Sequence, residues 1–437
     1  MTATRHHSLL SSERGAALLA ALCFATVLAI ALGSYLTLCT RSLQLSTRHL
    51  SSAHSIELAE TGLEEALWAL NKTDWTNGWT LTGATATKTL GGFAYDNGVT
   101  GSVSLTVTNY NGSLGATTAR TVTATGTTTL ADGTTSRRTL TTSSAQAPLF
   151  LNAVTGTTGR VKFRSAGTVD SYNSAAPDLD ATALGYSAIV ASGSTSTTAA
   201  TVQLTNAQIK GYVATLSTGP SYSTSAKVIG PATPATTKID SARLSTSPYQ
   251  PLFDEIAPGG TATLLPAGTA TIGTAGAASP ALYSATDLTL SGSDILTIDG
   301  PVTLNITGNL SVSNTAKIVL TATGTLEIHL SGDLILNGNG IQNLTKLPKN
   351  LLIAAKADNV YDTLGMSTNT PFYGVIYTPN NSLTISNSQT IYGAIVAKSV
   401  TFTASPALHY DVSLRDTVFR GLDTPYAISN WRETANP

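Results

Sequence analysis

The chain begins with its longest apolar stretch, residues 15–40, which contain no charged side chain. At about 1.5 Å per residue, a helix over this stretch reaches ~39 Å, more than the roughly 30 Å hydrocarbon layer of a bilayer. A cleaved secretory signal has an apolar core of only about 7–15 residues, with a small-residue cleavage site after it. No clear site of that kind closes the stretch before Arg41. The pattern therefore predicts a membrane-spanning helix.

Residues 41–72 keep a helical spacing of apolar side chains. These side chains recur mostly at steps of three, four and seven residues, with glutamates between them, and no Gly or Pro interrupts before Gly62. We expect one rod of roughly 55 residues, on the order of 80 Å long, that ends near Asn71. The apolar positions are Leu43, Leu50, Ala53, Leu58, Leu63, Leu67 and Leu70.

The charges that flank the span are nearly balanced. Arg5 and Arg14 precede it, and Arg41 and Arg48 follow it. The positive-inside rule therefore gives no clear orientation. Because most of the chain follows the span, an N-terminus in the cytoplasm would export the bulk of the protein.

Residues 73–147 alternate β-branched and polar side chains. Asn111-Gly112 and Asp132-Gly133 separate the alternating runs, and both dipeptides are typical of tight hairpin turns. We expect a small antiparallel sheet that packs on the amphipathic part of the helix. Pro148 marks the boundary to the next domain.

Residues 283–340 contain a short repeat. Apolar–x–apolar triplets begin at residues 302, 310, 318, 326 and 334, at a spacing of eight, with Gly, Asn and Asp between them. Short strands of this form fit the faces of a β-solenoid, with about 16–24 residues per coil. The alternative is an antiparallel meander, in which eight residues form one strand and one turn. We favour the solenoid.

A second repeat follows the first. Residues 373–377 and 392–396 both read Tyr-Gly followed by apolar residues and are predicted to form successive coils of the same solenoid. Residues 149–282 are rich in Thr, Ser, Gly and Ala and have no comparable pattern. The tail carries Phe419, Tyr426 and Trp431, which we expect to cap an open end of the stack.

Composition excludes several classes of protein. Only 11% of residues are charged and the net charge is -1, so the chain has no basic footprint for nucleic acid. Its two cysteines, Cys23 and Cys39, both lie in the apolar segment, about 24 Å apart on one helix, and cannot form a disulfide with each other. Stability must therefore come from β packing.

Two histidines lie beyond the helix, His329 and His409, and no cysteine accompanies them. A three-histidine or Cys/His metal site within one chain is therefore excluded. Strand alternation places His329 outward, which predicts solvent exposure. The run His409-Tyr410-Asp411 is either a fragment of a catalytic triad or a hydrogen-bonded corner at the end of the solenoid, and we favour the corner.

Four aspartates lie beside Gly or Asn turns, namely Asp287, Asp294, Asp299 and Asp333. Polysaccharide-cleaving solenoids use two or three carboxylates on one face, and Ca²⁺ takes oxygen ligands of the same kind. Asp is also a common turn residue. We favour turn chemistry, and expect no enzymatic activity and no cofactor, with Ca²⁺ as the alternative.

Two basic groups and a Trp cluster complete the candidate residues. Arg137 and Arg138 are predicted to lie on a solvated strand face. Arg160, Lys162 and Arg164 share one side of a strand by alternation, which would suit contact with an anionic surface. Aromatic residues near the end of the helix suit either a membrane interface or packing of the β domain. They are Trp68, Trp75 and Trp79.

The N-terminal sequence, ERGAALLAALCFATVLAIALGSYLTLCTRS followed by AETGLEEALWAL, resembles type IV pilin-like proteins, specifically PilX-type minor pilins. The resemblance implies a leader over 1–15, cleavage by prepilin peptidase after Gly15, and Ala16 as the mature N-terminus. Glu60 lies in the Ala-Glu-rich continuation. Most pilins have Glu at the fifth mature position, where this chain has Ala20. That difference implies a tip subunit rather than the bulk filament subunit.

The C-terminal part, from PKNLLIAA to SPALHYD, is similar to an uncharacterised β-rich domain that follows such N-termini. The expected fold is α+β and mostly β. It comprises a leader (1–15), a transmembrane and amphipathic helix (16–72), a pilin-like β head (73–147) and a β-solenoid resembling a right-handed parallel β-helix (148–437).

These expectations describe a pilin-like minor subunit of a type IV pilus or a related filament. Its helix would wait in the inner membrane with the N-terminus cytoplasmic, then enter a filament. Expected partners are other pilins, the pilus assembly machinery, prepilin peptidase, the inner membrane and a surface polysaccharide or host surface. The alternatives are a membrane-anchored surface solenoid that does not polymerise, and a carbohydrate-active solenoid.

Overall fold

The computed structural model contains two compact units, which we call the helix–sheet unit and the β body. The helix–sheet unit comprises Met1–Gly112, Thr118–Ala145 and Ile428–Pro437, and the β body comprises Ser113–Thr117 and Gln146–Ala427. The predictions for residues 1–9 lie outside the described residues. The structure describes residues 10–72, 74–111, 120–146, 149–176, 185–246, 261–266, 268, 270–355, 364–417, 419 and 426–434.

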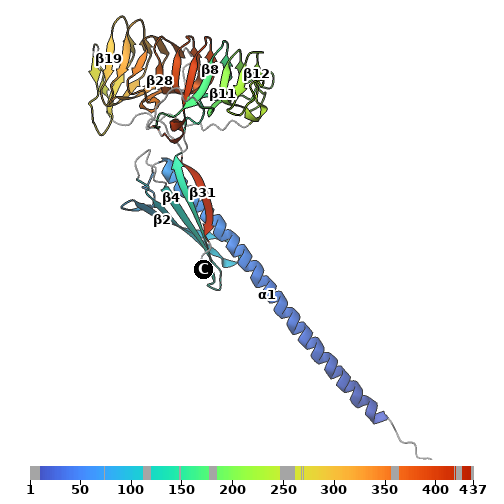
Figure 1. The fold of residues 1–437 in the computed structure, drawn as a ribbon. Coiled ribbons are helices and arrows are strands. Elements are labelled where there is room, and N and C mark those ends of the chain that lie inside the picture. Colours follow the sequence, from blue (N-terminus) through green and yellow to red (C-terminus); the bar gives the residue numbers. More distant parts are fainter. Residues whose placement is uncertain are drawn as a thin grey trace, which may run out of the picture. The chain divides into compact units, whose positions relative to one another are not determined.

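The helix–sheet unit is built on one continuous helix, α1 (Leu10–Lys72), about 95 Å long (Figure 1). The helix begins at Leu10, before the predicted start at residue 16, and ends at Lys72, close to the predicted end. A six-stranded sheet follows, in which β1 to β5 pair in sequence order as antiparallel hairpins, as predicted. Its strands are β1 (Thr80–Thr82), β2 (Thr85–Ala94), β3 (Thr100–Thr108), β4 (Arg120–Thr129), β5 (Thr135–Gln146) and β31 (Tyr426–Thr434).

The C-terminal strand β31 corrects one prediction. It begins at Tyr426 and lies beside β5 in the small sheet, so Trp431 belongs to the helix–sheet unit and not to a cap of the β body. An edge strand leaves backbone N–H and C=O groups unpaired, and β31 covers that edge of β5. Arg138 on β5 and Glu433 on β31 form an ion pair at 3.0 Å.

The β body consists of three ladders of short parallel strands (Figure 1). The first ladder contains β6 (Val154–Gly156), β9 (Ala188–Ser192), β14 (Leu244–Ser245), β15 (Thr263–Leu264), β17 (Ala281–Ala285), β20 (Pro301–Ile306), β23 (Thr325–Leu330) and β26 (Leu351–Ala355). The second contains β7 (Val161–Phe163), β10 (Val202–Leu204), β12 (Ser221–Tyr222), β18 (Leu288–Leu290), β21 (Leu310–Val312), β24 (Leu334–Gly338) and β27 (Leu364–Thr368).

The third ladder has two parts. The strands β8 (Thr168–Tyr172), β13 (Lys227–Ile229) and β30 (Ala407–Asp411) belong to the large sheet, whereas β16 (Thr271–Ile272), β19 (Ile295–Ile298), β22 (Lys317–Leu320) and β25 (Ile341–Asn343) form a separate four-stranded sheet. Three longer strands run through more than one ladder, namely β11 (Gln208–Thr215), β28 (Phe372–Ile385) and β29 (Thr390–Phe402). Short 3₁₀ turns, η1 (Asp96–Gly98), η2 (Ser241–Arg243), η3 (Pro348–Asn350) and η4 (Val412–Asp416), complete the described elements.

The repeat of eight residues places successive strands on successive ladders. Val302 on β20 therefore lies beside Leu326 on β23, and Leu310 on β21 lies beside Leu334 on β24. Tyr373 likewise pairs with Tyr392 in the second repeat. All of these pairings are parallel, so the antiparallel meander is wrong for residues 283–340.

The order of the coils along the stack differs from their order in the sequence. From one end, the first ladder runs β15, β17, β20, β23, β26, β28 and β29, and continues with β6, β9, β11 and β14. The chain thus joins the stack in its middle at β6 and reaches one end at β14. It resumes at the other end with β15 and returns to the middle at β30.

A junction therefore forms between two groups of coils, which we call the N-terminal coils (149–246) and the C-terminal coils (261–411). There β6 and β7 pair with β29, and β8 pairs with β30. Phe163 and Phe402 stack across the junction with ring centroids 4.5 Å apart, and both are fully buried. Inward side chains of both groups belong to one continuous apolar core.

Candidate membrane and assembly helix

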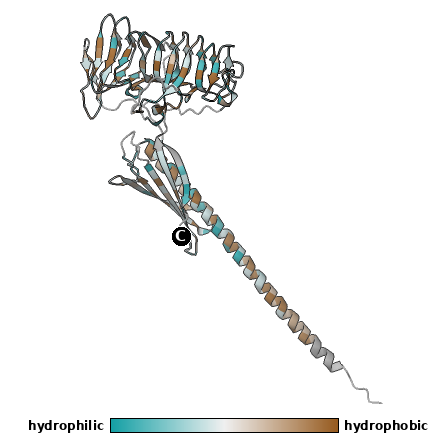
Figure 2. Ribbon diagram, in the orientation of Figure 1, coloured by the Kyte–Doolittle hydropathy of each residue, from teal (hydrophilic) through white to brown (hydrophobic). Residues whose placement is uncertain are grey.

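The first half of α1 is mostly apolar and exposed. Side chains from residue 17 to residue 50 are exposed, and Leu28 is 71% exposed. Ala20, Cys23 and Cys39 lie in this exposed half. Figure 2 shows it as the continuous hydrophobic part of the helix. The helix is long and apolar enough to cross a membrane.

The second half of α1 packs on the sheet through small side chains. Its buried face recurs at steps of three and four residues and forms one stripe along the helix. The stripe comprises Ser51, Ser55, Ala59, Gly62, Ala66 and Ala69. It faces apolar side chains of the sheet, namely Val103, Leu105, Val107, Val122, Ala124 and Leu140.

The apolar positions predicted to form the packing face of α1 are only partly correct. Leu58, Leu63 and Leu70 are buried beside the stripe of small residues. Leu43, Leu50 and Ala53 are exposed, and Leu67 is only partly buried. Leu43 and Leu50 precede the first buried helix residue, and Ala53 points away from the sheet because two residues rotate a helix by roughly 200°.

Two glycines bring helix and sheet into close contact. A Cβ atom on Gly62 would lie 2.4 Å from the Leu105 side chain. A Cβ atom on Gly126 of β4 would lie 2.1 Å from the backbone oxygen of Ser55 and 2.8 Å from the backbone nitrogen of Ala59. The first contact involves a side chain that can move, whereas the second involves helix backbone. Gly126 therefore sets the distance between α1 and β4.

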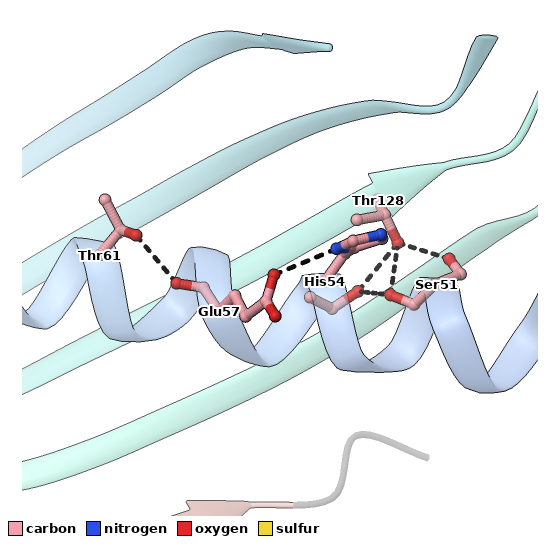
Figure 3. A network of polar contacts seen from close by, with 6 residues as sticks. Ser51, His54, Glu57, Thr61 and Thr128 are labelled. Carbon is pink, nitrogen blue, oxygen red and sulfur yellow. Dashed lines mark hydrogen bonds and ion pairs between the residues drawn. The ribbon is translucent and has the colours of Figure 1, made fainter. Parts of the chain in front are cut away.

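A buried cluster of hydroxyl groups fixes the position of the helix along the sheet (Figure 3). The Oγ1 atom of Thr128 lies 2.6 Å from Ser51 Oγ and 2.9 Å from Ser55 Oγ. Thr128 also donates to the backbone oxygen of Ser51, and Ser55 donates to those of Ser51 and Ser136. All three hydroxyl-bearing residues are at most 2% exposed. Sliding the helix by one turn would break the bonds that Thr128 and Ser136 form with Ser51 and Ser55, and would leave only the bond of Ser55 within the helix.

Thr128→Val tests this cluster. The substitution keeps the shape of the side chain and removes the hydroxyl shared by Ser51 and Ser55. We expect the free energy of unfolding to fall by about 1–3 kcal/mol, because buried hydroxyls lose a partner. Denaturant unfolding of the full chain in detergent, followed by Trp fluorescence, measures this. Thr127→Val is the control, because Thr127 lies on the same strand outside the buried cluster, and an equal effect there would contradict the interpretation.

Polar and aromatic contacts surround the start of the packed half. His54 Nδ1 lies 3.1 Å from Glu57 Oε2 (Figure 3), and the His54 ring stacks on Tyr95 at 4.3 Å. Burial, with the nearby charge of Glu57, raises the pKa of Tyr95. At the far end of α1, Glu65 pairs with Lys88 at 2.6 Å. These contacts hold both ends of the packed half to the sheet.

The Trp cluster packs within the helix–sheet unit. Trp75 lies edge-to-face with Trp79 at 5.0 Å and with Tyr110 at 4.9 Å. Trp68 is 46% exposed and lies about 42 Å along the helix from Thr40. If the apolar half spans a bilayer, these residues are too far away to mark its interface.

The proposed processing site lies within α1. Gly15 and Ala16 are helical, and their side-chain surroundings lie outside the described residues. Glu60 is exposed on the face of the helix away from the sheet. Arg137 is exposed as predicted, whereas Arg138 is partly buried and donates to Ser52 Oγ at 2.9 Å.

The four aspartates take part in turns of the β body. Asp287 Oδ1 accepts from the backbone of Asn309, and Asn309 Oδ1 accepts from the backbone of Asp333, so the side chains of Asp287 and Asn309 connect three successive coils. Asp294 accepts from a backbone N–H of its own turn, and Asp299 accepts from two hydroxyls of the next coil. Within the described residues, no three His, Cys, Asp or Glu side chains gather as metal ligands would.

The prediction for His329 is wrong. Its side chain is 2% exposed, although it points outward from β23. The neighbouring outward residue on the next coil, Ala354, is also buried. Alternation distinguishes the core side of a strand from its outer side, and it cannot tell whether other parts of the chain cover the outer side.

His409 lies at the junction, in the middle of the stack rather than at its end. Its Nδ1 atom lies 2.5 Å from Oδ1 of Asp170 on the adjacent coil, and Lys210 Nζ lies 3.8 Å from the other oxygen. Asp170 is 2% exposed. Tyr373 stacks on Tyr392 at 4.3 Å, and Tyr392 lies 4.7 Å from His409. These side chains form one continuous line of contacts across the junction.

Tyr410 and Asp411 also form structural contacts there. Tyr410 donates to the backbone oxygen of Phe150 at 2.7 Å, and burial raises the pKa of Tyr410 to about 12. Asp411 accepts from the backbone and hydroxyl of Ser174 and from the backbone of Ser413. Together these bonds form the hydrogen-bonded corner that the sequence favoured, at a different position in the stack.

One family model matches part of the chain. Residues 235–417 are similar to a domain of unknown function, DUF7305. The match covers less than half of the chain, includes the C-terminal coils, and leaves out α1 and the small sheet. No curated protein and no solved structure matches the chain.

Proposed function

We propose that this protein is a pilin-like minor subunit of a type IV pilus or related filament. The main support is the division of α1 into an exposed apolar half and a half that packs on a small antiparallel sheet. The exposed half requires an apolar environment, either lipid or the helices of neighbouring subunits. One rigid rod can pass from the first environment to the second without refolding.

The helix would lie in the inner membrane with a cytoplasmic N-terminus and then move into a filament core. Prepilin peptidase would cleave after Gly15, and other pilins would receive the mature helix. Ala20 offers no carboxylate at the fifth mature position. A helix without this carboxylate suits a location at the tip, or a role in priming, better than repeated incorporation along the filament.

The β body would be the part that the subunit displays, for adhesion or as a spacer. We interpret its three parallel ladders as a β-solenoid of the right-handed parallel β-helix type. Its turn aspartates have structural roles, which favours a non-enzymatic function over a carbohydrate-active one. A surface solenoid that keeps its membrane anchor and never polymerises is the alternative, because an exposed apolar helix suits that protein equally well.

N-terminal sequencing and intact mass of the native protein test the proposal. We expect a mature chain that begins at Ala16, and loss of that processing in a Gly15→Leu variant. Leu10→Ala is the control, because it alters the leader without changing the cleavage site. A native protein that keeps Met1 in the membrane fraction would overturn the pilin-like role and support the permanent anchor. A deletion strain with normal pili and normal attachment would also count against it.

A further inference from the structure

The two groups of coils in the β body differ in charge. Among the described residues, the N-terminal coils carry seven cations and two carboxylates, Asp170 and Asp240, and the sequence has two further aspartates in this range, Asp178 and Asp180. Asp170 is buried beside His409 and Lys210, and Asp240 lies 3.8 Å from Arg243. Both carboxylates therefore pair with cations other than those beside β7. The cations are Arg160, Lys162, Arg164, Lys210, Lys227, Lys238 and Arg243.

Three of these cations form a row along β7. Val161 and Phe163 are buried in the core, so alternation turns Arg160, Lys162 and Arg164 to the outer side. A bond from Arg160 Nε to the backbone oxygen of Ala200, 2.8 Å long, orients the first guanidinium. The row spans roughly 13 Å along the strand. We call it the cationic row.

The neighbours of the cationic row are neutral hydrogen-bonding groups. On the adjacent strands of the second ladder, the outward residues in register with Lys162 are Thr401 and Thr384 on one side and Gln203 and Ser221 on the other. Lys162 is the one charged residue at this register position of the second ladder within the described coils. These neighbours include no carboxylate that could neutralise the row.

The three charges repel one another. Burial and then the charges of Arg160 and Arg164 lower the pKa of Lys162. In the described part of the chain, none of the three forms an ion pair with a carboxylate. A bound anion would relieve this repulsion, so binding and folded-state stability would increase together.

We propose that the cationic row binds an acidic polysaccharide. Its three cations would pair with carboxylates of the sugar chain, while Gln203 and the neighbouring threonines would bond sugar hydroxyls. The outer side of β7 carries no aromatic side chain on which a nucleic-acid base could stack. It also carries no apolar side chain that could enter a bilayer. The surface is therefore suited to a hydrated, negatively charged chain.

The test measures binding of the full chain, held in nanodiscs of a zwitterionic lipid, to polygalacturonate and to neutral dextran. We expect binding to polygalacturonate that weakens as salt increases, and no binding to dextran. Lys162→Gln should weaken binding about 5-fold, and the triple variant R160Q/K162Q/R164Q at least about 30-fold. Lys317→Gln is the matched control, because Lys317 also lies on a strand of the body, away from the cationic row. Thermal unfolding of each variant shows that the fold is retained.

Four outcomes would overturn the proposal. They are unchanged binding by the triple variant, an equal loss in Lys317→Gln, equal binding to dextran, and competition by single-stranded DNA or anionic vesicles as strong as that by the glycan. The inference concerns the β body and does not require α1 to enter a filament. Failure of glycan binding would therefore leave the N-terminal processing result intact, and the reverse also holds.

Discussion

Gly126→Leu is expected to lower the free energy of unfolding of the helix–sheet unit by about 3 kcal/mol or more. The new side chain would meet the backbone of Ser55 and Ala59 at distances that no rotamer avoids. Overpacking against movable side chains costs about 1–3 kcal/mol, and a helix backbone cannot yield in the same way. Either α1 separates from β4 or the sheet distorts, and both results expose Leu58 and the hydroxyl cluster.

Gly91→Leu is the matched control for this substitution. Gly91 lies on β2 in the same sheet, and a Cβ atom there would meet nothing within 4 Å. Denaturant unfolding of both variants in detergent, followed by the fluorescence of Trp75 and Trp79, separates packing from glycine's backbone entropy. A transition of Gly126→Leu that coincides with that of Gly91→Leu would show that helix and sheet are not in close contact.

The end of α1 could be predicted, but its start at Leu10 and its contact face could not. Length, absence of charge and helical spacing led directly to one continuous helix that ends at Lys72. The face was assigned from leucines, because hydrophobicity identifies large apolar side chains. The actual contact depends on how closely two backbones approach, which favours Gly62, Ser55 and Ala59. Their pattern of small residues was present in the sequence and could have been found by the same spacing test.

The C-terminal coils could be predicted because each ladder position recurs in the sequence at nearly constant intervals. The N-terminal coils were not, since their strands have two to eight residues and irregular spacing. The position of the N-terminal coils in the stack could not be predicted from any local sequence pattern. Val396 pairs with Thr155, across more than half of the chain, and nothing near either residue indicates the other. The hydrogen bond between His409 and Asp170 depends on the adjacent pairing of β30 with β8 and was missed for the same reason.

Phe163→Asp is expected to open the junction of the β body and to cost at least about 4 kcal/mol. Phe163 is fully buried and stacks on Phe402. The variant removes a large apolar side chain and places a carboxylate in the core, and each change alone is strongly destabilising. Thr384→Asp is the control, because it adds the same charge at an exposed outward position of the second ladder.

Hydrogen exchange of the full chain locates the opening and tests the order of the coils. In a stack each coil contacts only its neighbours, so destabilisation spreads from the altered coil outward. We expect Phe163→Asp to remove protection from residues 154–163 and from residues 395–402 together, while residues 302–336 keep theirs. Residues 188–215 adjoin β6 and β7 on the other side and should lose protection as well. If the coils were stacked in sequence order, the loss at 188–215 would remain, but residues 395–402 would be spared. Retained protection at 395–402 would therefore contradict the junction, because β29 would not depend on β7.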